Sequence, residues 1–173
     1  EDSTDLVLDT ASFDYRSRAV GGLVERGEFE KAEKQLFGLL EEAGERTPRY
    51  AQIACGLGGL YRQLGDERRA RQYYMLSALA DVCNATKENA SFQELARMSY
   101  AAGDLSDAFK YAQAAIEDAQ FSNVQFRTAQ MAELYSIINA AYQAKEERAK
   151  SQIQHYMLLI SLLSALLAGL LVY

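Results

Sequence analysis

The chain has 173 residues, a length that fits one modest domain or a short repeat array. Its 24 acidic and 18 basic residues give a formal net charge of −6, which argues against a general nucleic-acid binder. Two cysteines and one histidine exclude a multi-cysteine zinc module and a disulfide-framework mini-protein, and a single proline favours an almost entirely helical chain.

The N-terminal segment, residues 1–12, begins EDSTDLVLDT and is acidic. It lacks the apolar core of a signal peptide, so we expect a tail that precedes the folded part. The chain does not start with Met, which indicates a processed protein or an excised fragment.

Residues 13–120 contain three stretches that align with one another without gaps. A glycine recurs every 38 residues, and an alanine follows each glycine by five residues. Glycine tolerates the left-handed conformation that ends a helix, and alanine lets two antiparallel helices approach closely. The repeated positions are Gly27, Gly65 and Gly103, with Ala32, Ala70 and Ala108.

This pattern resembles the tetratricopeptide repeat (TPR) family, whose units pair two antiparallel helices with Gly, Ala and aromatic positions in this order. The resemblance implies an all-α, TPR-like solenoid of three helical hairpins over residues 13–120. The sequence departs from the family in two respects. Its period is 38 residues instead of about 34, and the terminal proline of the repeat is missing.

Residues 121–155 predict a fourth helix, because Leu134, Ile137, Ile138 and Ala141 recur at helical spacing. Two interpretations stay open. The segment is a connector helix that closes the array and runs on into the next segment, with a kink near residues 144–147. Alternatively, it forms an ordinary fourth hairpin that is followed by a separate helix.

The C-terminal segment, residues 156–173, carries no charge and is long enough to approach the thickness of a bilayer core. We expect a transmembrane helix, with Tyr156 and Tyr173 at the two interfaces. The alternative is a buried core helix, although such a helix usually keeps a polar stripe. Ser161, Ala165 and Gly169 are spaced four apart, which predicts close packing of two such helices in a homodimer.

The order of repeats, connector and span is similar to a family of membrane-anchored TPR regulators of Bacteroidetes. The segment FRTAQMAELYSIINAAYQAKEERAK before the span carries this narrower resemblance. It implies a single-pass protein of the inner membrane with its repeats in the periplasm, and a coiled coil and regulatory region that follow the span in the cytoplasm. The balanced charge of EERAKSQIQH leaves the orientation undecided on the positive-inside rule.

The sequence offers little for catalysis. We expect no enzyme, no cofactor and no metal site, because His155 is the only histidine and stands at the start of the apolar segment without a supporting Ser, Cys or Asp constellation. The GLGG run at residues 56–59 is apolar and mid-helical, so its glycines are expected to allow close helix packing. Cys55 and Cys83 belong to one repeat unit, and both a disulfide and two buried free thiols stay open.

Binding is the better interpretation. In TPR arrays the first helix of each hairpin lines the concave surface that holds peptides, and transfer of those positions implies a groove of polar residues. Arginine pairs with carboxylates through charge-assisted hydrogen bonds, and tyrosine can stack, so the groove is suited to a carboxylate or a peptide backbone. The alternative is that these are ordinary solvated side chains. The groove residues are Gln52, Arg62 and Gln63 from the second unit and Gln93, Arg97 and Tyr100 from the third.

These observations predict a non-catalytic protein- or peptide-binding module that forms the extracytoplasmic sensor of a single-pass membrane regulator. The alternative is a membrane-anchored scaffold that assembles partner proteins without signalling. No nucleic-acid partner is expected for this part of the chain.

Overall fold

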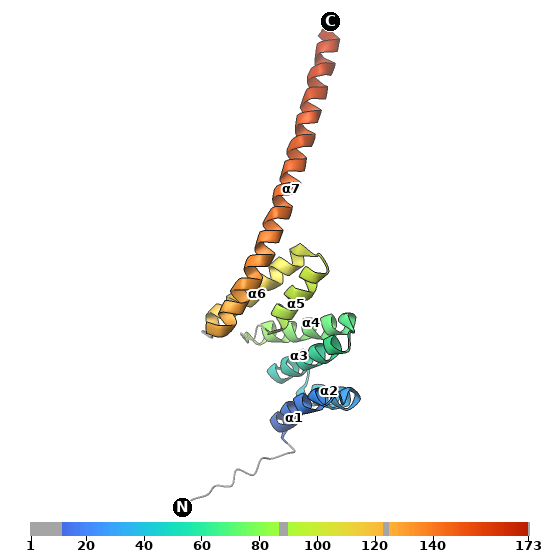
Figure 1. The fold of residues 1–173 in the computed structure, drawn as a ribbon, viewed down its shortest axis with the longest axis vertical. Helices are drawn as coiled ribbons and strands as arrows, with labels where there is room; N and C mark the ends of the chain where they lie inside the picture. Colours follow the sequence, from blue (N-terminus) through green and yellow to red (C-terminus); the bar gives the residue numbers. More distant parts are fainter. Residues whose placement is uncertain (1–11, 87–89, 123–124, 173) are drawn as a thin grey trace, which may run out of the picture.

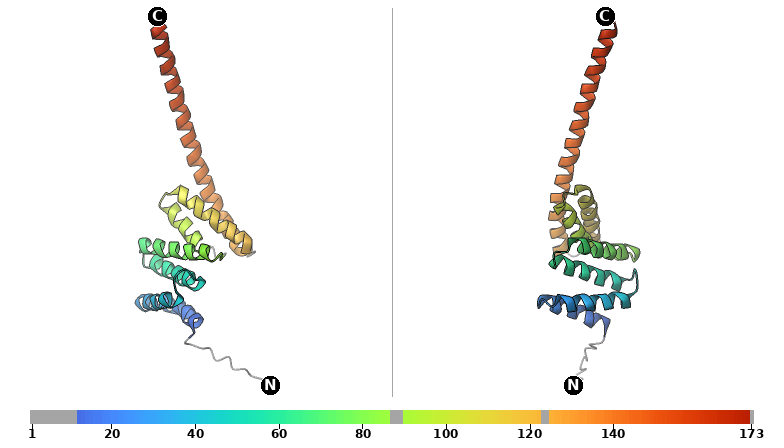
Figure 2. Two further views of the ribbon diagram at one scale, coloured as in Figure 1. Left: turned by 180° about the vertical axis from the view of Figure 1, so that it is seen from behind. Right: turned by 90° about the vertical axis from the view of Figure 1, so that its right-hand side faces the viewer.

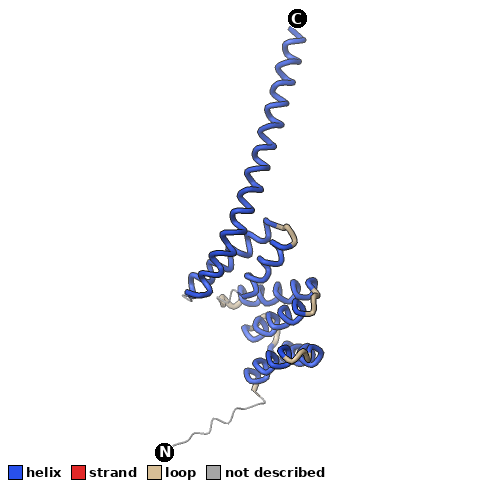
Figure 3. The backbone as a smooth tube through the Cα atoms, in the orientation of Figure 1, coloured by secondary structure: helices blue, strands red, loops and turns tan. Residues whose placement is uncertain are grey.

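The computed structural model describes residues 12–86, 90–122 and 125–172, with the backbone alone for 118–122, 125–131 and 172. Residues 1–11 of the predicted tail and Tyr173 at the predicted interface lie outside the described residues. The described residues form seven helices and no strand (Figure 3). The predicted all-α fold is therefore confirmed.

The first six helices pair into three hairpins that stack on one another, followed by one long helix (Figures 1 and 2). Neighbouring helices in the chain are also neighbours in space, as in a solenoid. The hairpins are α1 (Phe13–Glu25) with α2 (Phe29–Ala43), α3 (Pro48–Gln63) with α4 (Glu67–Cys83), and α5 (Ala90–Ala101) with α6 (Leu105–Ser122); the long helix is α7 (Gln125–Val172).

The repeated glycines make the turns inside the hairpins. Gly27, Gly65 and Gly103 have φ of 75°, 75° and 77°, in the left-handed region that favours glycine. The residue after each glycine donates its backbone N–H to a carbonyl in the preceding helix at 2.9 Å, which satisfies a carbonyl that the helix end leaves free. The same local chemistry, used three times, sets the hairpin geometry.

Small residues set how closely the paired helices approach. Ala32, Ala70 and Ala108 are fully buried. In the second hairpin, Gly58 of α3 lies against the ring of Tyr74 on α4, and a Cβ at Gly58 would stand 2.7 Å from that ring. The expectation of close packing at the GLGG run is confirmed at this glycine.

Helix α7 closes the array and then leaves it (Figure 1). Its buried Ile138 packs in a cluster with Ala108 and Ala112 of α6 and with Ala96 of α5. Tyr142 stacks on Phe109 with ring centroids 4.7 Å apart. From residue 147 to residue 171 every residue is exposed.

The helix is unbroken from Gln125 to Val172, which corresponds to about 72 Å. Of the two interpretations of residues 121–155, the structure supports the connector that runs on into the apolar segment. The fourth hairpin with a separate helix is wrong.

Candidate protein-interaction site

An arginine-rich groove lies where the end of α3 and the start of α4 meet α5. It has a volume of about 720 Å³, and four arginines face two glutamates in its walls. The apolar part of the floor comes from α5. We call it the arginine groove; its lining residues are Arg62, Glu67, Arg68, Arg71, Glu94, Arg97, Met98, Ala101 and Ala102.

Glu94 holds together the two arginines that the sequence singles out. Arg62 Nη1 donates to Glu94 Oε2, and Arg97 Nη1 donates to Glu94 Oε1 at 3.4 Å. The charge of Glu94 raises the pKa of Arg62, so that guanidinium keeps its charge. Because Arg62 is on α3 and Glu94 on α5, this contact joins two successive repeats.

The other two arginines of the groove come from the first turns of α4. Arg71 Nη1 donates to Ser99 Oγ at 3.2 Å, and Arg71 Nη2 lies 3.7 Å from Asp107 Oδ2. Arg68 is exposed and has no carboxylate within 4.0 Å among the described residues. The groove therefore presents a cationic wall that its own glutamates only partly neutralise.

The remaining predicted groove residues are spread more widely. Gln63 and Tyr100 are exposed and Gln93 is half-buried, and none of these three lines the arginine groove. Gln52 is exposed at the opposite end of α3 and lines a different cavity. The structure thus brings Arg62 and Arg97 together and places Gln52 apart from them.

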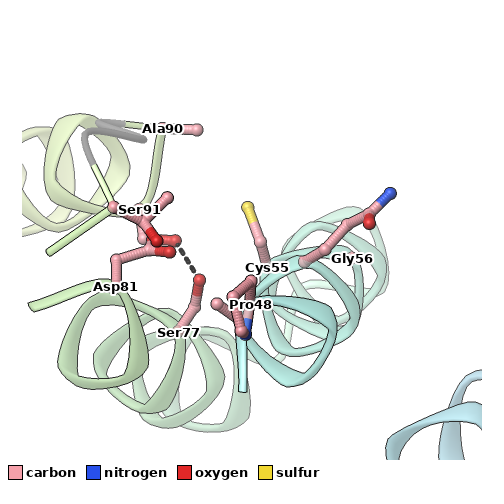
Figure 4. Close-up of a pocket in the computed structure, with 10 residues that line it drawn as sticks. Pro48, Cys55, Gly56, Ser77, Asp81, Ala90 and Ser91 are labelled. Atoms are coloured by element: carbon pink, nitrogen blue, oxygen red, sulfur yellow. Dashed lines mark hydrogen bonds between the residues drawn. The ribbon is translucent and has the colours of Figure 1, made fainter. Parts of the chain in front are cut away.

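The cavity at Gln52, of about 570 Å³, is formed by the start of α3, the end of α4 and the start of α5 (Figure 4). Ser91 Oγ donates to Ser77 Oγ at 2.7 Å across this cavity, and Asp81 in its wall is buried. Every buried side-chain nitrogen and oxygen among the described residues has a hydrogen-bond partner. The polar wall is therefore satisfied by protein groups.

Cys55 and Cys83 are not joined by a disulfide. Cys55 is half-buried in the wall of the Gln52 cavity, and Cys83, the last residue of α4, is exposed. The disulfide alternative is therefore not found, and the burial expected of the free thiols is wrong for Cys83. Cys83 ends up exposed because α4 terminates there, at the edge of the hairpin.

The described residues contain one helical stretch, Ala132–Leu171, that is long and apolar enough to cross a membrane, and its most apolar window has a mean hydropathy of 1.7. None of that window is buried, unlike a core helix. Ala165 and Gly169 line a shallow groove with Leu162, Leu166 and Leu170. Ser161 donates its hydroxyl to the Met157 carbonyl at 2.8 Å within the helix.

Among the residues that the structure describes, no group of three or more His, Cys, Asp or Glu side chains is placed to hold a metal ion. His155 is exposed on α7, and its Nδ1 lies 2.7 Å from the carbonyl oxygen of Ser151.

Comparison with known families agrees with this architecture. The model of the SusR N-terminal TPR domain matches residues 1–133, which is more than half of the chain. The chain belongs to this family. TPR domains are typically non-catalytic modules for protein interaction, so the SusR-type TPR assignment makes a protein-interaction role the general function of this array. No curated protein matches the chain.

The TPR resemblance read from the repeats is confirmed by this SusR-type assignment. Sequence reasoning missed Glu94, Arg68 and Arg71. The spacing of Glu94 and Arg97, three residues apart, is a signal for a helical ion pair. No local pattern connects Glu94 to Arg62, because that contact depends on how two repeats stack.

Proposed function

We propose that this SusR-type TPR array is the extracytoplasmic sensor of a single-pass regulator in the inner membrane, with the repeats in the periplasm. It binds a protein or peptide that carries carboxylates. The observation that carries this proposal is the arginine groove, in which four arginines face two glutamates beside an apolar floor. Such a groove suits an acidic chain end or an acidic side chain.

Glu94 gives the groove a specific mechanism. It occupies Arg62 and Arg97 in the unbound array, so an incoming carboxylate competes with it or pairs with the less engaged Arg68. The binding surface is proposed to extend along α3 and α5, the helices that carry Gln63, Gln93 and Tyr100. Gln52, near the start of α3, is proposed to lie at the other end of this surface.

Transmission would use α7. The same helix packs on the last hairpin through Ile138 and contains the apolar stretch, so a change in that packing reaches the membrane through continuous hydrogen-bonded backbone. A ligand shifts the equilibrium only if it binds one arrangement more tightly. We propose that the two arrangements differ in the pairing of two copies through Ser161, Ala165 and Gly169.

The groove is tested with two peptides of ten residues, one rich in Glu and one with Gln at the same positions, by fluorescence anisotropy on the full chain in detergent micelles. Arg62→Ala and Arg97→Ala should each weaken binding of the Glu peptide by about two- to fivefold, as expected for half-exposed ion pairs. Arg18→Ala, an exposed arginine on α1, is the matched control.

Glu94→Gln supplies a change of opposite sign. It frees both arginines, so binding of the Glu peptide should become tighter, whereas general damage to the fold would weaken it. If the Glu peptide binds no better than the Gln peptide, or if Glu94→Gln weakens binding, the groove assignment is wrong.

Sensing is separated from scaffolding by cross-linking in the membrane. With Ala165→Cys in a Cys55→Ser, Cys83→Ser background, oxidation traps copies whose apolar helices pair. A sensor predicts that the bound partner changes the yield of trapped dimer. An unchanged yield at saturating partner would favour the scaffold.

A further inference from the structure

Helix α4 packs against α3 and α5, and these contacts leave one apolar face of the helix exposed. On the other face, Met75, Leu79 and Val82 are 48%, 51% and 62% exposed. Their spacing of four and three residues places them in one row along the helix. The buried residues of α4 are Ala70, Tyr74, Ser77, Ala78, Ala80 and Asp81. Three large apolar side chains in one exposed row form an unpartnered face.

Cations extend the same row toward the start of the helix. Arg68 and Arg71 precede Met75 by seven and four residues, and they line one cavity of about 560 Å³ with Met75 and Leu79. We call the row Arg68, Arg71, Met75, Leu79 and Val82 the α4 strip. It is about 21 Å long, which is the length of four helical turns.

We infer that the α4 strip binds an acidic amphipathic α-helix of a partner protein. The apolar row presents the i, i+4, i+7 spacing that matches the apolar stripe of such a helix. The arginines at one end require acidic residues at the facing end of the partner, which also fixes its direction. The inference rests on the proposed role in protein interaction. The strip shares Arg68 and Arg71 with the arginine groove, whereas Arg62 and Arg97 belong to the groove and not to the strip.

A second copy of this chain is a poor occupant. When two strips pair antiparallel, the arginines of one copy face the Val82 end of the other. The acidic residues of α4 are Glu67, beside the arginines, and the buried Asp81. No acid on α4 is therefore available to meet Arg68 and Arg71.

A lipid surface is also a poor occupant. The contact of α7 with the array ends near Tyr142, and the uncharged segment begins at Tyr156, about 21 Å farther along the helix. Helix α4 lies on the side of α5 and α6 that is turned away from the C-terminal end of α7 (Figure 1). The strip is thus far from the apolar end of the chain.

The test is site-specific photo-cross-linking in cells of the native host. Leu79→Cys in the Cys55→Ser, Cys83→Ser background is labelled with a benzophenone maleimide, irradiated, and the cross-linked peptide is sequenced by mass spectrometry. Met75→Cys is a second probe position, and Lys34→Cys on α2 is the exposed control. Tyrosine near-UV circular dichroism of each purified variant verifies the fold.

We expect both strip probes, and not the control, to cross-link to the same amphipathic segment with acidic residues at one end. Arg68→Glu with Arg71→Glu should lower the yield by about tenfold, and replacing the acids of the partner with Lys should restore it. Cross-linking only to a second copy, only to lipid, to a segment without acids, or to no protein would overturn the inference. A cross-link yield that stays unchanged when Arg68 and Arg71 are replaced by Glu would also overturn the inference.

The outcome is distinguishable from a failure of the arginine groove through the residues that the two surfaces do not share. Arg62→Ala with Arg97→Ala should leave the Leu79 cross-link unchanged, because these two arginines line the groove and not the strip. If peptide binding in the groove fails while the Leu79 cross-link persists, the groove assignment alone is wrong. If the cross-link fails while the Glu peptide binds, the strip inference alone is wrong.

Discussion

Two adjacent glycines of α3 predict opposite effects of the same substitution. A Cβ at Gly58 would lie 2.7, 2.8 and 2.9 Å from three ring atoms of Tyr74, whereas a Cβ at Gly59 would meet only the Tyr74 hydroxyl at 3.8 Å. The first set of distances is below van der Waals contact with a buried ring. The second is an ordinary contact.

The magnitudes follow from two opposing contributions. Replacing glycine by alanine inside a helix stabilises the protein by about 0.8–1 kcal/mol, and overpacking a core costs about 1–3 kcal/mol. Gly59→Ala should therefore raise the free energy of unfolding by up to about 1 kcal/mol. Gly58→Ala should lower it by up to about 2 kcal/mol, because the ring must move.

The pair is compared by thermal melts of the full chain in detergent micelles, followed by tyrosine near-UV circular dichroism. For a domain of this size, 1 kcal/mol corresponds to about 2–4 °C in Tm. The difference between the two variants removes the shared propensity gain and reports the packing cost alone. Equal shifts of Tm, or a Gly58→Ala variant more stable than Gly59→Ala, would refute the close approach of α3 and α4.

Three further predictions concern the array and its junction with α7. Ile138→Ala should destabilise the docking of α7 by about 2–5 kcal/mol, seen as faster hydrogen exchange in α6 and α7 with α1 and α2 unchanged. Burial raises the pKa of Tyr61 and of Tyr74 to about 12, from 10.0, so ultraviolet titration should show at least two late tyrosines. Because the folded state keeps these phenols neutral, their contribution to the free energy of unfolding should be complete below pH 10 and lost between pH 10 and 12. A single tyrosine titration near pH 10 would contradict this prediction. Gly65→Ala should lower the free energy of unfolding by about 1–2 kcal/mol, because φ is 75° there, and an unchanged Tm would exclude strain at that turn.

The turns and pairings inside each hairpin were predictable because their chemistry is local. Gly27, Gly65 and Gly103 need only their own φ angles and a carbonyl one turn back, so a constant spacing in the sequence already encodes them. The sequence did not decide whether residues 121–155 form a continuous helix or a fourth hairpin. The two arrangements differ only in whether a turn interrupts the polar part of this segment.

The groove was harder to predict because it depends on contacts between repeats. Transfer of family positions selected Arg62 and Arg97, which the structure brings together, but overlooked Glu94, which pairs with both. It also placed Gln52 with them, although the length of α3 puts that side chain at the other end of the helix. The family pattern thus predicts which helix carries a groove residue better than it predicts the position of that residue along the helix.

We propose that the repeats face the periplasm and are joined to one membrane span. The most direct measurement is cysteine accessibility in intact cells of the native host. Lys34→Cys, exposed on α2, is placed in a Cys55→Ser, Cys83→Ser background and treated with a maleimide that crosses the outer membrane only. We expect labelling before lysis, with the protein in the inner-membrane fraction. Labelling only after lysis would place the array in the cytoplasm and contradict the proposed sensor.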